Sequence, residues 1–331
     1  MPSNTNKVGI KVKLVVLSGG TGTPKLLEGL RHVVPEEDIT VVVNVADNFW
    51  WNDLYIAPDV DTVLYLFANI LDTGKYWGIK EDTFNFLQQA KQYGLDWTWF
   101  NIGDRDLATH ITRTLLMKRG YTLTQVTKYL ASKLRIRATV LPATDNHVET
   151  YVLTNIGNLH IQEYLVKYRM EPEVHGITFL GLEKAKVTRD VITALEQADA
   201  IIIGPSNTVN SILPILKVQG LGEKIKELRG EVPVVAISPI VGNRPFSGPL
   251  HKFLKAIGYE PSSYSVAEIL RDYVDAMVVD VRDREVGERI SKELEIYVIT
   301  SNIVMTDLKS KIKLAREVVK IIESMKQCRK A

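Results

Sequence analysis

The sequence predicts an α/β protein: a Rossmann-like, doubly wound and mainly parallel sheet with a mostly helical insertion. Two observations predict the sheet: short apolar runs recur along the chain, and helical patterns separate several of them. These runs are apolar on both faces, which is typical of a parallel sheet covered by helices on each side. In such a fold, ligands bind at the carboxyl ends of the strands.

The expected strands are β-branched and almost continuously apolar. They are VKLVVLS (12–18), ITVVVNVAD (39–47), DAIIIGPSN (199–207), VPVVAISPI (232–240) and AMVVDV (276–281). The expected helices between them are TPKLLEGLRHVV (23–34), VTRDVITALEQA (187–198) and SVAEILRDYV (265–274). A last helix, at about 306–327, has an apolar stripe at alternating steps of four and three, so we expect it to pack on the sheet.

Two stretches interrupt this alternation. Residues 62–134 are rich in aromatic side chains, and we expect them to form a helical insertion that walls one side of the site. Residues 138–166 alternate between polar and apolar, which predicts strands or hairpins at a sheet edge. Because no repeat or Pro/Ser-rich linker is found, we expect a single unit over 1–331, with its core at about 12–61 and 138–327.

Composition excludes several classes of protein. The 331 residues are 45% apolar and 24% charged, as in ordinary globular proteins. The net charge of +2, without a run of Lys or Arg, predicts no nucleic-acid partner. A single cysteine, Cys328, excludes an internal disulfide and a cysteine-built metal site. No apolar stretch suits a membrane span or a signal peptide, so we expect a cytoplasmic protein with no membrane partner.

A glycine-rich turn, LSGGTGTPKLLEGL (17–30), leads from the first strand into a helix. It does not fit the P-loop pattern G-x-x-x-x-G-K-[ST], because Pro24 precedes Lys25 and Leu26 follows it. It does not fit the dinucleotide pattern G-x-G-x-x-G either, since Lys25 occupies the third glycine position. Free amides at a helix start form an anion site, so we predict phosphate binding here, with a ligand-free tight turn as the alternative.

Two further strand exits carry polar residues. GPSNTVNSILPIL (204–216) brings Ser206 and Asn207, and SPIVGNRPFSGPLHKFL (238–254) brings Asn243 and Ser247. Each exit alone is as consistent with a plain connection as with a binding loop. Three such exits on one sheet edge converge on a crevice, and together they favour a nucleotide with more than one phosphate.

The segment APDVDTVLYLF (57–67) places Asp59 and Asp61 just before a helical pattern. A carboxylate at a helix start is stabilised by the helix dipole, so capping is the alternative to a functional role for Asp59. We favour a functional role for Asp61, because a second acidic cluster occurs further along the chain.

That second cluster is NIGDRDLATHITR (101–113), in which Asp104 and Asp106 flank Arg105. Asp106, His110 and Arg113 are spaced by four and three, which places them on one helix face. Two carboxylate clusters with positive groups suit a site that binds magnesium and phosphate. For Arg105 and Asp106, the alternative is a structural ion pair.

The motifs SGGTGTPKLL, PDVDTVLYLF, GDRDLATH, GPSN and SPIVGNRPFSGP resemble, in order and spacing, the 2-phospho-L-lactate transferase family of archaeal coenzyme F(420) biosynthesis. The resemblance spans about 13–326. It implies a Rossmann-like homodimer that uses Mg²⁺ to transfer a phospholactyl group from lactyl-2-diphospho-5'-guanosine to the deazaflavin Fo. The products would be F(420)-0 and GMP. Some relatives use an enolpyruvyl-phosphoryl donor instead.

The resemblance also implies roles for individual residues. The guanosine diphosphate part would be held by Gly19, Gly20, Thr21, Gly22, Thr23, Lys25, Ser206, Asn207, Asn243 and Ser247. Fo would contact Asp61, Thr62 and Asn101, the last at a position where the family often has lysine. The catalytic residues would be Asp61, Asp104 and Arg105, and the metal ligands Asp59 and Asp61. Asp61 would either accept the proton of the attacking hydroxyl or ligate the metal.

Two other functions are alternatives to this one. A regulator of the gluconeogenesis-factor type has a similar glycine loop and binds nucleotide sugars without catalysis. A nicotinamide dehydrogenase is disfavoured because the dinucleotide pattern fails at Lys25.

Overall fold

The computed structural model describes residues 12–242, 244–246 and 248–330, and its centre is a seven-stranded sheet in the order β14-β13-β10-β9-β1-β2-β5. All neighbouring strands run parallel. The strands are β1 (Leu14–Ser18), β2 (Ile39–Val43), β5 (Thr139–Pro142), β9 (Ala200–Ile203), β10 (Val234–Ile237), β13 (Ala276–Asp280) and β14 (Tyr297–Ser301). The predicted α/β fold class is confirmed.

Four of the central strands, β1, β9, β10 and β13, are buried at every residue. Helices cover both faces of these strands, so neither face needs polar side chains and the sequence there is uniformly apolar. This explains why continuous apolar runs, rather than an alternating pattern, marked the strands.

The order of the strands reverses direction at β1. From β1 the chain moves through β2 to β5 at one edge, and it then returns to β9 on the other side of β1 and continues to β14. Since parallel crossovers are right-handed, the crossover helices of the two halves cover opposite faces of the sheet, whereas the C-terminal helix, which follows the last strand, packs on the face of the first half. Accordingly α1 (Gly22–Leu30) packs on α2 (Pro58–Phe67) and α12 (Leu308–Lys330), whereas α8 (Leu221–Leu228) packs on α6 (Arg189–Glu196) and α7 (Leu213–Lys217).

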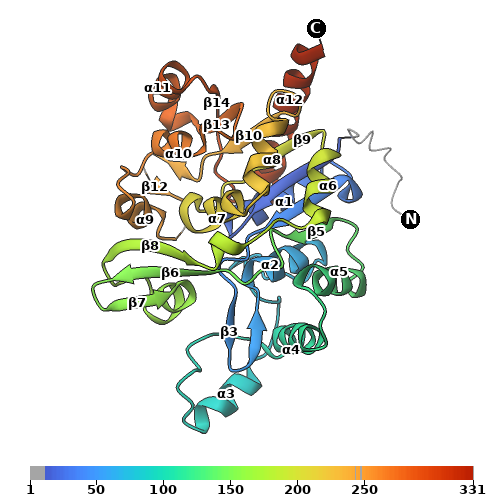
Figure 1. Cartoon of the computed structure of the whole chain (residues 1–331), viewed down its shortest axis with the longest axis vertical. Coiled ribbons are helices and arrows are strands. Elements are labelled where there is room, and N and C mark those ends of the chain that lie inside the picture. Colours follow the sequence, from blue (N-terminus) through green and yellow to red (C-terminus); the bar gives the residue numbers. More distant parts are fainter. Residues whose placement is uncertain (1–11, 243, 247, 331) are drawn as a thin grey trace.

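A reversal of this kind leaves a crevice between the two strands where it occurs. Here the crevice lies at the carboxyl ends of β1 and β9, near the middle of the molecule in Figure 1.

The remaining elements surround this core. The other helices are α3 (Asn85–Gln92), α4 (Asp104–Lys118), α5 (Leu123–Lys133), α9 (Leu250–Ala256), α10 (Ser263–Leu270) and α11 (Arg284–Leu294). Short helical turns are η1 (Glu36–Asp38), η2 (Glu163–Lys167), η3 (Leu182–Lys184), η4 (Thr208–Ile212) and η5 (Val281–Asp283). The strand pair β11 (Ile240–Val241) and β12 (Arg244–Pro245) is antiparallel. Among the described residues, no helix is both long and apolar enough to cross a membrane.

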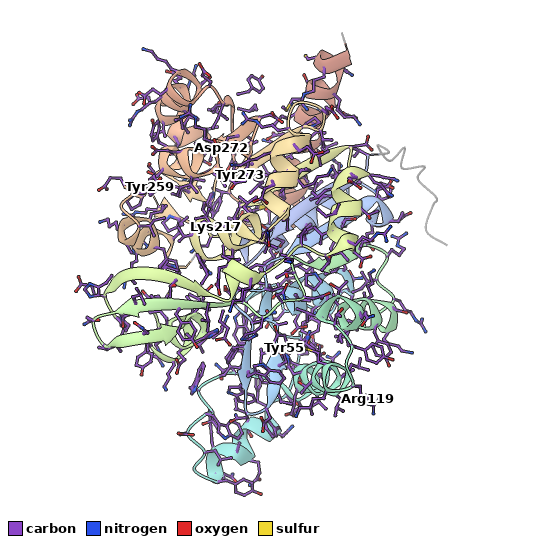
Figure 2. The ribbon with its side chains drawn as sticks, in the orientation of Figure 1. Tyr55, Arg119, Lys217, Tyr259, Asp272 and Tyr273 are labelled. Atoms are coloured by element: carbon purple, nitrogen blue, oxygen red, sulfur yellow. The ribbon has the colours of Figure 1, made fainter. Side chains whose placement is uncertain are left out.

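A hairpin that the sequence analysis did not anticipate precedes the helical segment. Strands β3 (Phe49–Trp51) and β4 (Leu54–Ile56) pair through a two-residue turn, and Figure 1 shows the hairpin with α3 and α4 below the main sheet. The backbone N–H of Tyr55, labelled in Figure 2, donates to Thr114 Oγ1 at 2.8 Å and so ties the hairpin to α4. Helix α2 follows at Pro58, a residue suited to the first turn of a helix.

Residues 138–166 divide between two sheets. Strand β5 joins the edge of the main sheet, whereas β6 (Glu149–Thr154) and β7 (Gly157–His160) form a hairpin in a separate antiparallel sheet with β8 (Val174–Leu180). Figure 1 shows this second sheet projecting to one side of the core.

Candidate functional site

A cavity of about 550 Å³ opens at the crevice between β1 and β9. Its lining combines the turn after β1, the turn after β9 and the start of α2 with loops from the helical segment and from the 246–250 region. The residues of the glycine turn that line it are Gly20, Thr21, Gly22 and Lys25. The predicted position of the site, at the carboxyl ends of the strands, therefore coincides with a cavity.

The turns after β1 and β9 are locked together by small residues and hydroxyls. A Cβ on Gly22 would lie 2.0 Å from the carbonyl oxygen of Pro205, so only glycine permits this approach. Thr23 Oγ1 and Ser206 Oγ lie 2.6 Å apart, and Gly19 N–H donates to Ser206 Oγ at 3.1 Å. Thr23 and Ser206 thus join the two turns and do not line the cavity.

The other residues predicted to hold the diphosphate fall into two groups. Asn207 lines the cavity, and its Oδ1 accepts hydrogen bonds from the N–H groups of Val209 (3.0 Å) and Asn210 (3.3 Å). Asn243 and Ser247 lie outside the described residues.

Two buried carboxylates, Asp47 and Asp59, face the cavity next to the glycine turn. Asn44 Nδ2 bridges them, donating to Asp47 Oδ1 at 3.1 Å and to Asp59 Oδ2 at 3.0 Å. Asn210 Nδ2 donates to Asp47 Oδ2 at 3.2 Å. Within the described part of the chain, neither carboxylate forms an ion pair with Lys, Arg or His, so the pair lacks a positive partner.

The electrostatics of the pair follow from this environment. Burial raises the pKa of Asp47 well above its ordinary value, and the negative charge of Asp59 raises it further. Burial also raises the pKa of Asp59, although hydrogen bonds from Asn44 and from the Gly20 backbone oppose the rise. Two adjacent buried carboxylates without a cation favour uptake of a proton or of a metal ion.

Asp61, two residues after Asp59 in α2, has a different environment. Arg113 of α4, itself fully buried, donates two hydrogen bonds to the Asp61 carboxylate, one from Nη1 to Oδ2 at 3.0 Å and one from Nη2 to Oδ1. Nδ1 of His110 lies 3.6 Å from Asp61 Oδ2. Burial raises the pKa of Asp61, and the Arg113 guanidinium limits that rise.

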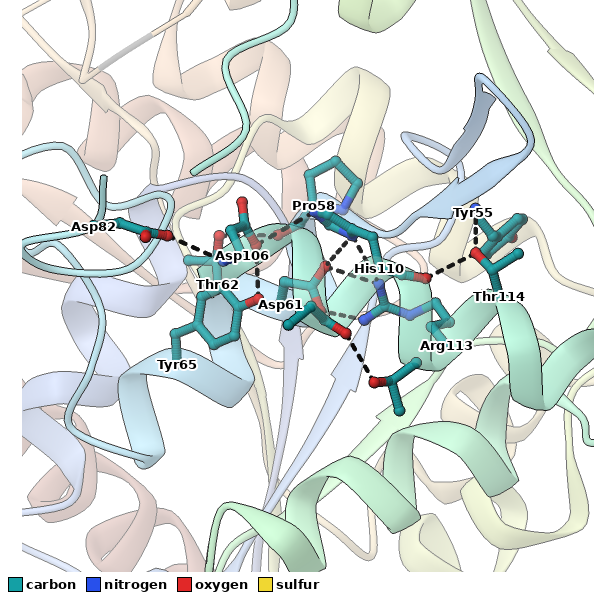
Figure 3. Close-up of polar contacts among 12 residues, drawn as sticks. Tyr55, Pro58, Asp61, Thr62, Tyr65, Asp82, Asp106, His110, Arg113 and Thr114 are labelled. Atoms are coloured by element: carbon teal, nitrogen blue, oxygen red, sulfur yellow. Dashed lines mark hydrogen bonds and ion pairs between the residues drawn. The ribbon is translucent and has the colours of Figure 1, made fainter. Parts of the chain in front are cut away.

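Asp106 completes this network from the first turn of α4. Tyr65 O–H donates to Asp106 Oδ1 at 2.7 Å, and His110 Nε2 lies 3.3 Å from the same oxygen. Burial opposes ionisation of Asp106, but His110 and Tyr65 outweigh it and hold the pKa of this carboxyl below its usual range. Figure 3 shows these side chains from α2 and α4 pointing toward one another.

Ligand atoms of Asp61, Asp106 and His110 lie within 4.8 Å of one another, a spacing that could suit a metal ion. However, Arg113 Nη1 lies 3.2 Å from His110 Nδ1 and bonds Asp61, so a full positive charge already occupies the cluster. A divalent cation is better accommodated by Asp47 and Asp59, which have no such partner.

Asp104 and Arg105 are placed outside the cavity lining. The Asp104 carboxylate accepts from the N–H groups of Asn85 (3.1 Å) and Phe86 (3.0 Å) and thereby caps α3. Its pKa is lowered to about 2 because Thr83 and these amides hydrogen-bond the ionised form. Arg105 Nη1 donates to the Lys80 carbonyl at 3.2 Å on the surface. This geometry favours Asp106 and His110 over Asp104 and Arg105 as functional groups.

Replacing Asp104 by alanine should lower the melting temperature and leave turnover close to that of the unaltered protein. The variant removes the hydrogen bonds that cap α3 but no atom that lines the cavity. Thermal melting and a turnover assay on the same preparation check this. A steep fall in turnover at unchanged melting temperature would instead indicate that Asp104 is a catalytic residue.

The far wall of the cavity is mainly apolar and aromatic. Thr62 and Asn101, predicted to contact the acceptor, both line it. The apolar residues that line the cavity include Ile56, Trp77, Phe100, Leu165, Val166 and Met170. The cavity therefore offers polar groups at the strand exits and a large apolar surface for a flat ring system.

Sequence reasoning missed Asn44, Asp47, Tyr65 and Asn210 as site residues. Asp47 ends the predicted strand ITVVVNVAD (39–47), so the rule that polar residues at strand exits converge could have found it. Tyr65 and Asn210 lie inside helical patterns and carry no such signal.

Known proteins share both the sequence and the fold. A sequence model of the family described as 2-phospho-L-lactate transferase CofD matches residues 14–324. The chain is 42% identical over 306 residues to a 2-phospho-L-lactate transferase of Methanosarcina mazei, covering 92% of this chain and 99% of that protein. It is 40% identical over 316 residues to the protein of the same name from Methanocaldococcus jannaschii, covering 94% and 99%.

Among solved structures, a UPF0052-family protein from Bacillus halodurans superposes with a TM-score of 0.61 at 20% sequence identity. The match covers 94% of this chain and 100% of that one, so the two chains share a fold throughout.

Proposed function

Because this chain belongs to the 2-phospho-L-lactate transferase CofD family and is a transferase of a phospholactate group, we propose a specific reaction for it. The donor is lactyl-2-diphospho-5'-guanosine or its enolpyruvyl analogue, the acceptor is the deazaflavin Fo, and the products are F(420)-0 and GMP. The protein acts as a Mg²⁺-dependent homodimer. The relatives of about 40% identity carry the transferase name, which favours this function over a nucleotide-sugar-binding regulator.

One observation carries the proposal: a helix-start glycine turn and two buried carboxylate groups line the same cavity. Gly20, Thr21 and Gly22 lie at the start of α1, where backbone amides attract phosphate oxygens. Lys25 adds an ammonium on the next turn of the helix. A diphosphate fits this end, and the apolar wall fits the acceptor ring.

The carboxylates next to the glycine turn fit a magnesium ion. Mg²⁺ is usually bound by one or two carboxylates together with substrate phosphates, and it retains several waters. Asp47 and Asp59 would hold it, because both are buried, face the cavity and lack a positive partner among the described residues. When bound, the ion would neutralise charge on the diphosphate. Asp61, whose carboxylate is held by Arg113, is therefore better assigned to proton transfer than to metal binding.

The reaction requires an alcohol to attack phosphorus in line. The acceptor oxygen forms a new bond to the phosphorus of the phospholactyl group, and the bond from that phosphorus to the GMP oxygen breaks. The hydroxyl proton passes to Asp61, whose raised pKa makes it a better base than an ordinary carboxylate. Arg113 and His110 fix the orientation of Asp61, and the amides of the glycine turn stabilise charge on the leaving GMP.

Incubating the protein with Fo, Mg²⁺ and lactyl-2-diphospho-5'-guanosine should release GMP together with F(420)-0. Chromatography with detection of the deazaflavin absorbance measures both products in one run, and a reaction without Fo is the control. Tight binding of a UDP-sugar with no GMP release would instead support the regulator.

A further inference from the structure

A partly buried charge cluster lies between α1 and α12, next to the phosphate end of the cavity. Glu28 Oε2 accepts a hydrogen bond from Lys311 Nζ at 2.8 Å and another from the Tyr76 hydroxyl. Lys311 is only 7% exposed. A Cβ on Gly29 would lie 2.2 Å from the Lys311 carbonyl oxygen, so the close packing of the two helices fixes Lys311 beside Glu28.

Lys25 lies against the ring of the same tyrosine. Its Nζ is 5.1 Å from the centre of the Tyr76 ring, and Lys311 Nζ is 5.0 Å from it. Lys25 lines the cavity, whereas Glu28 and Lys311 do not. In the described part of the chain, Lys25 forms no ion pair. Glu28 is therefore committed to Lys311 and Tyr76, and the ammonium of Lys25 stays available.

This arrangement is not the one that the helix alone would favour. Lys25 and Glu28 are three residues apart on α1, a spacing at which opposite charges pair on a helix surface. Such a pair would partly cancel the positive charge at the phosphate end. Lys311 competes for the same carboxylate oxygen from a buried position, where a charge needs a partner.

We propose that Lys311 and Tyr76 are positioning residues that hold the Glu28 carboxylate away from Lys25, so that Lys25 meets the phosphate oxygens of the ligand unpaired. The inference rests on the proposed function, because it assigns the diphosphate to this end of the cavity. Lys311 can act in this way without contacting the ligand, since it does not line the cavity.

The test is the binding of GDP and of inorganic pyrophosphate to the full chain by titration calorimetry. In Lys311→Met, Glu28 keeps the Tyr76 hydroxyl but loses its cationic partner. Its charge is then free to pair with Lys25, and both ligands should bind about tenfold more weakly, the value of one charge-assisted contact. In Glu28→Gln/Lys311→Met the competing carboxylate is absent, and most of the lost affinity should return. If Lys311 has only a structural role, the double variant should bind both ligands no better than Lys311→Met, because it removes both members of the pair.

Lys326→Met is the matched control, because Lys326 also lies on α12 and outside the cavity lining, but it pairs with Asp199 and not with Glu28. It should bind both ligands as the unaltered protein does. If Lys311→Met does not fold, Lys311→Gln allows the same comparison, and thermal melting identifies which variants are folded.

Two results would overturn the inference and leave the proposed function intact. One is that Lys311→Met binds GDP and pyrophosphate as tightly as the unaltered protein, and the other is that the double variant binds them as weakly as Lys311→Met. Binding of pyrophosphate but not GDP by the unaltered protein would count against the guanosine part of the proposed function, and the pyrophosphate series would still decide the inference. Binding of neither ligand would overturn both.

Discussion

Asp61→Asn is expected to lose transfer activity by about 10²–10⁴-fold, the usual contribution of a positioned general base. Asparagine has the same shape and still accepts a hydrogen bond from Arg113, but it cannot take the proton of the attacking hydroxyl. GDP binding should persist, because the glycine turn and Asn207 lie at other strand exits. Single-turnover GMP release and GDP titration measure the two properties separately.

The cost of this variant to folding must be measured as well. Removing the charge of Asp61 leaves the buried guanidinium of Arg113 without its counter-charge, and breaking such a pair costs about 3–5 kcal/mol. Asp104→Asn is a suitable control, since Asp104 lies at the start of the same helix as Arg113 but outside the cavity. Turnover of Asp61→Asn equal to that of the control would remove Asp61 from the mechanism.

The pH profile provides a second measure of the role of Asp61. Only the ionised carboxylate can act as the base, and burial raises its pKa despite the opposing effect of Arg113. In the unaltered protein, turnover should therefore fall on acidification at a pH above 3.8, the ordinary pKa of aspartate. The residual rate of Asp61→Asn should lack this decline.

Asp47→Asn is expected to weaken Mg²⁺ binding by about 100-fold or more, because even the outer-shell partners of a metal contribute about 10–100-fold. The same change should stabilise the metal-free protein, since it removes one of two adjacent buried carboxylates. Titration calorimetry with Mg²⁺ and thermal melting without it measure these opposite effects. Loss of stability in the metal-free variant together with native Mg²⁺ affinity would contradict the assignment.

The effect on stability has a defined pH dependence. Both carboxyl groups have folded-state pKa values above the ordinary value of 3.8, so the native state binds protons that the unfolded chain has released. Their contribution to stability is therefore full at low pH, decreases as pH rises above 3.8 through the raised values, and is constant beyond them. The melting temperature of Asp47→Asn relative to the unaltered protein should rise across this interval without metal. Saturating Mg²⁺ should remove or reverse the difference at neutral pH.

The fold class could be predicted because strands inside a doubly covered sheet leave a local signal. Every residue of β1, β9, β10 and β13 is buried, so the apolar runs were visible without knowledge of their neighbours. The hairpin of β3 and β4 was missed although its signal was present. Its turn residues, Asn52 and Asp53, both have positive φ (47° and 60°), a conformation that asparagine and aspartate tolerate.

The orientation of the carboxylates in GDRD could not be predicted. Residues two apart on an α-helix point about 200° from each other, so Asp104 and Asp106 cannot both face the same partner. The helical spacing placed Asp106, His110 and Arg113 on one face, and the structure shows that this face meets Asp61 and Tyr65. Asp104 instead accepts hydrogen bonds from the first amides of α3. That helix lies 18–19 residues from Asp104 in the sequence, so a local sequence pattern does not predict the contact.

The parallel α/β fold, the family and the glycine-rich turn after the first strand could all be recognised in the sequence, because periodicity, glycine content and motif spacing are properties of contiguous residues. Which charged side chains contact one another follows from the tertiary structure alone. Asp47 and Asp59 share Asn44, Asp61 is bound by Arg113 from another helix, and Glu28 is bound by a lysine 283 residues away. Electrostatic interactions depend on distance through space and on burial, and both are set by how the strands and helices pack.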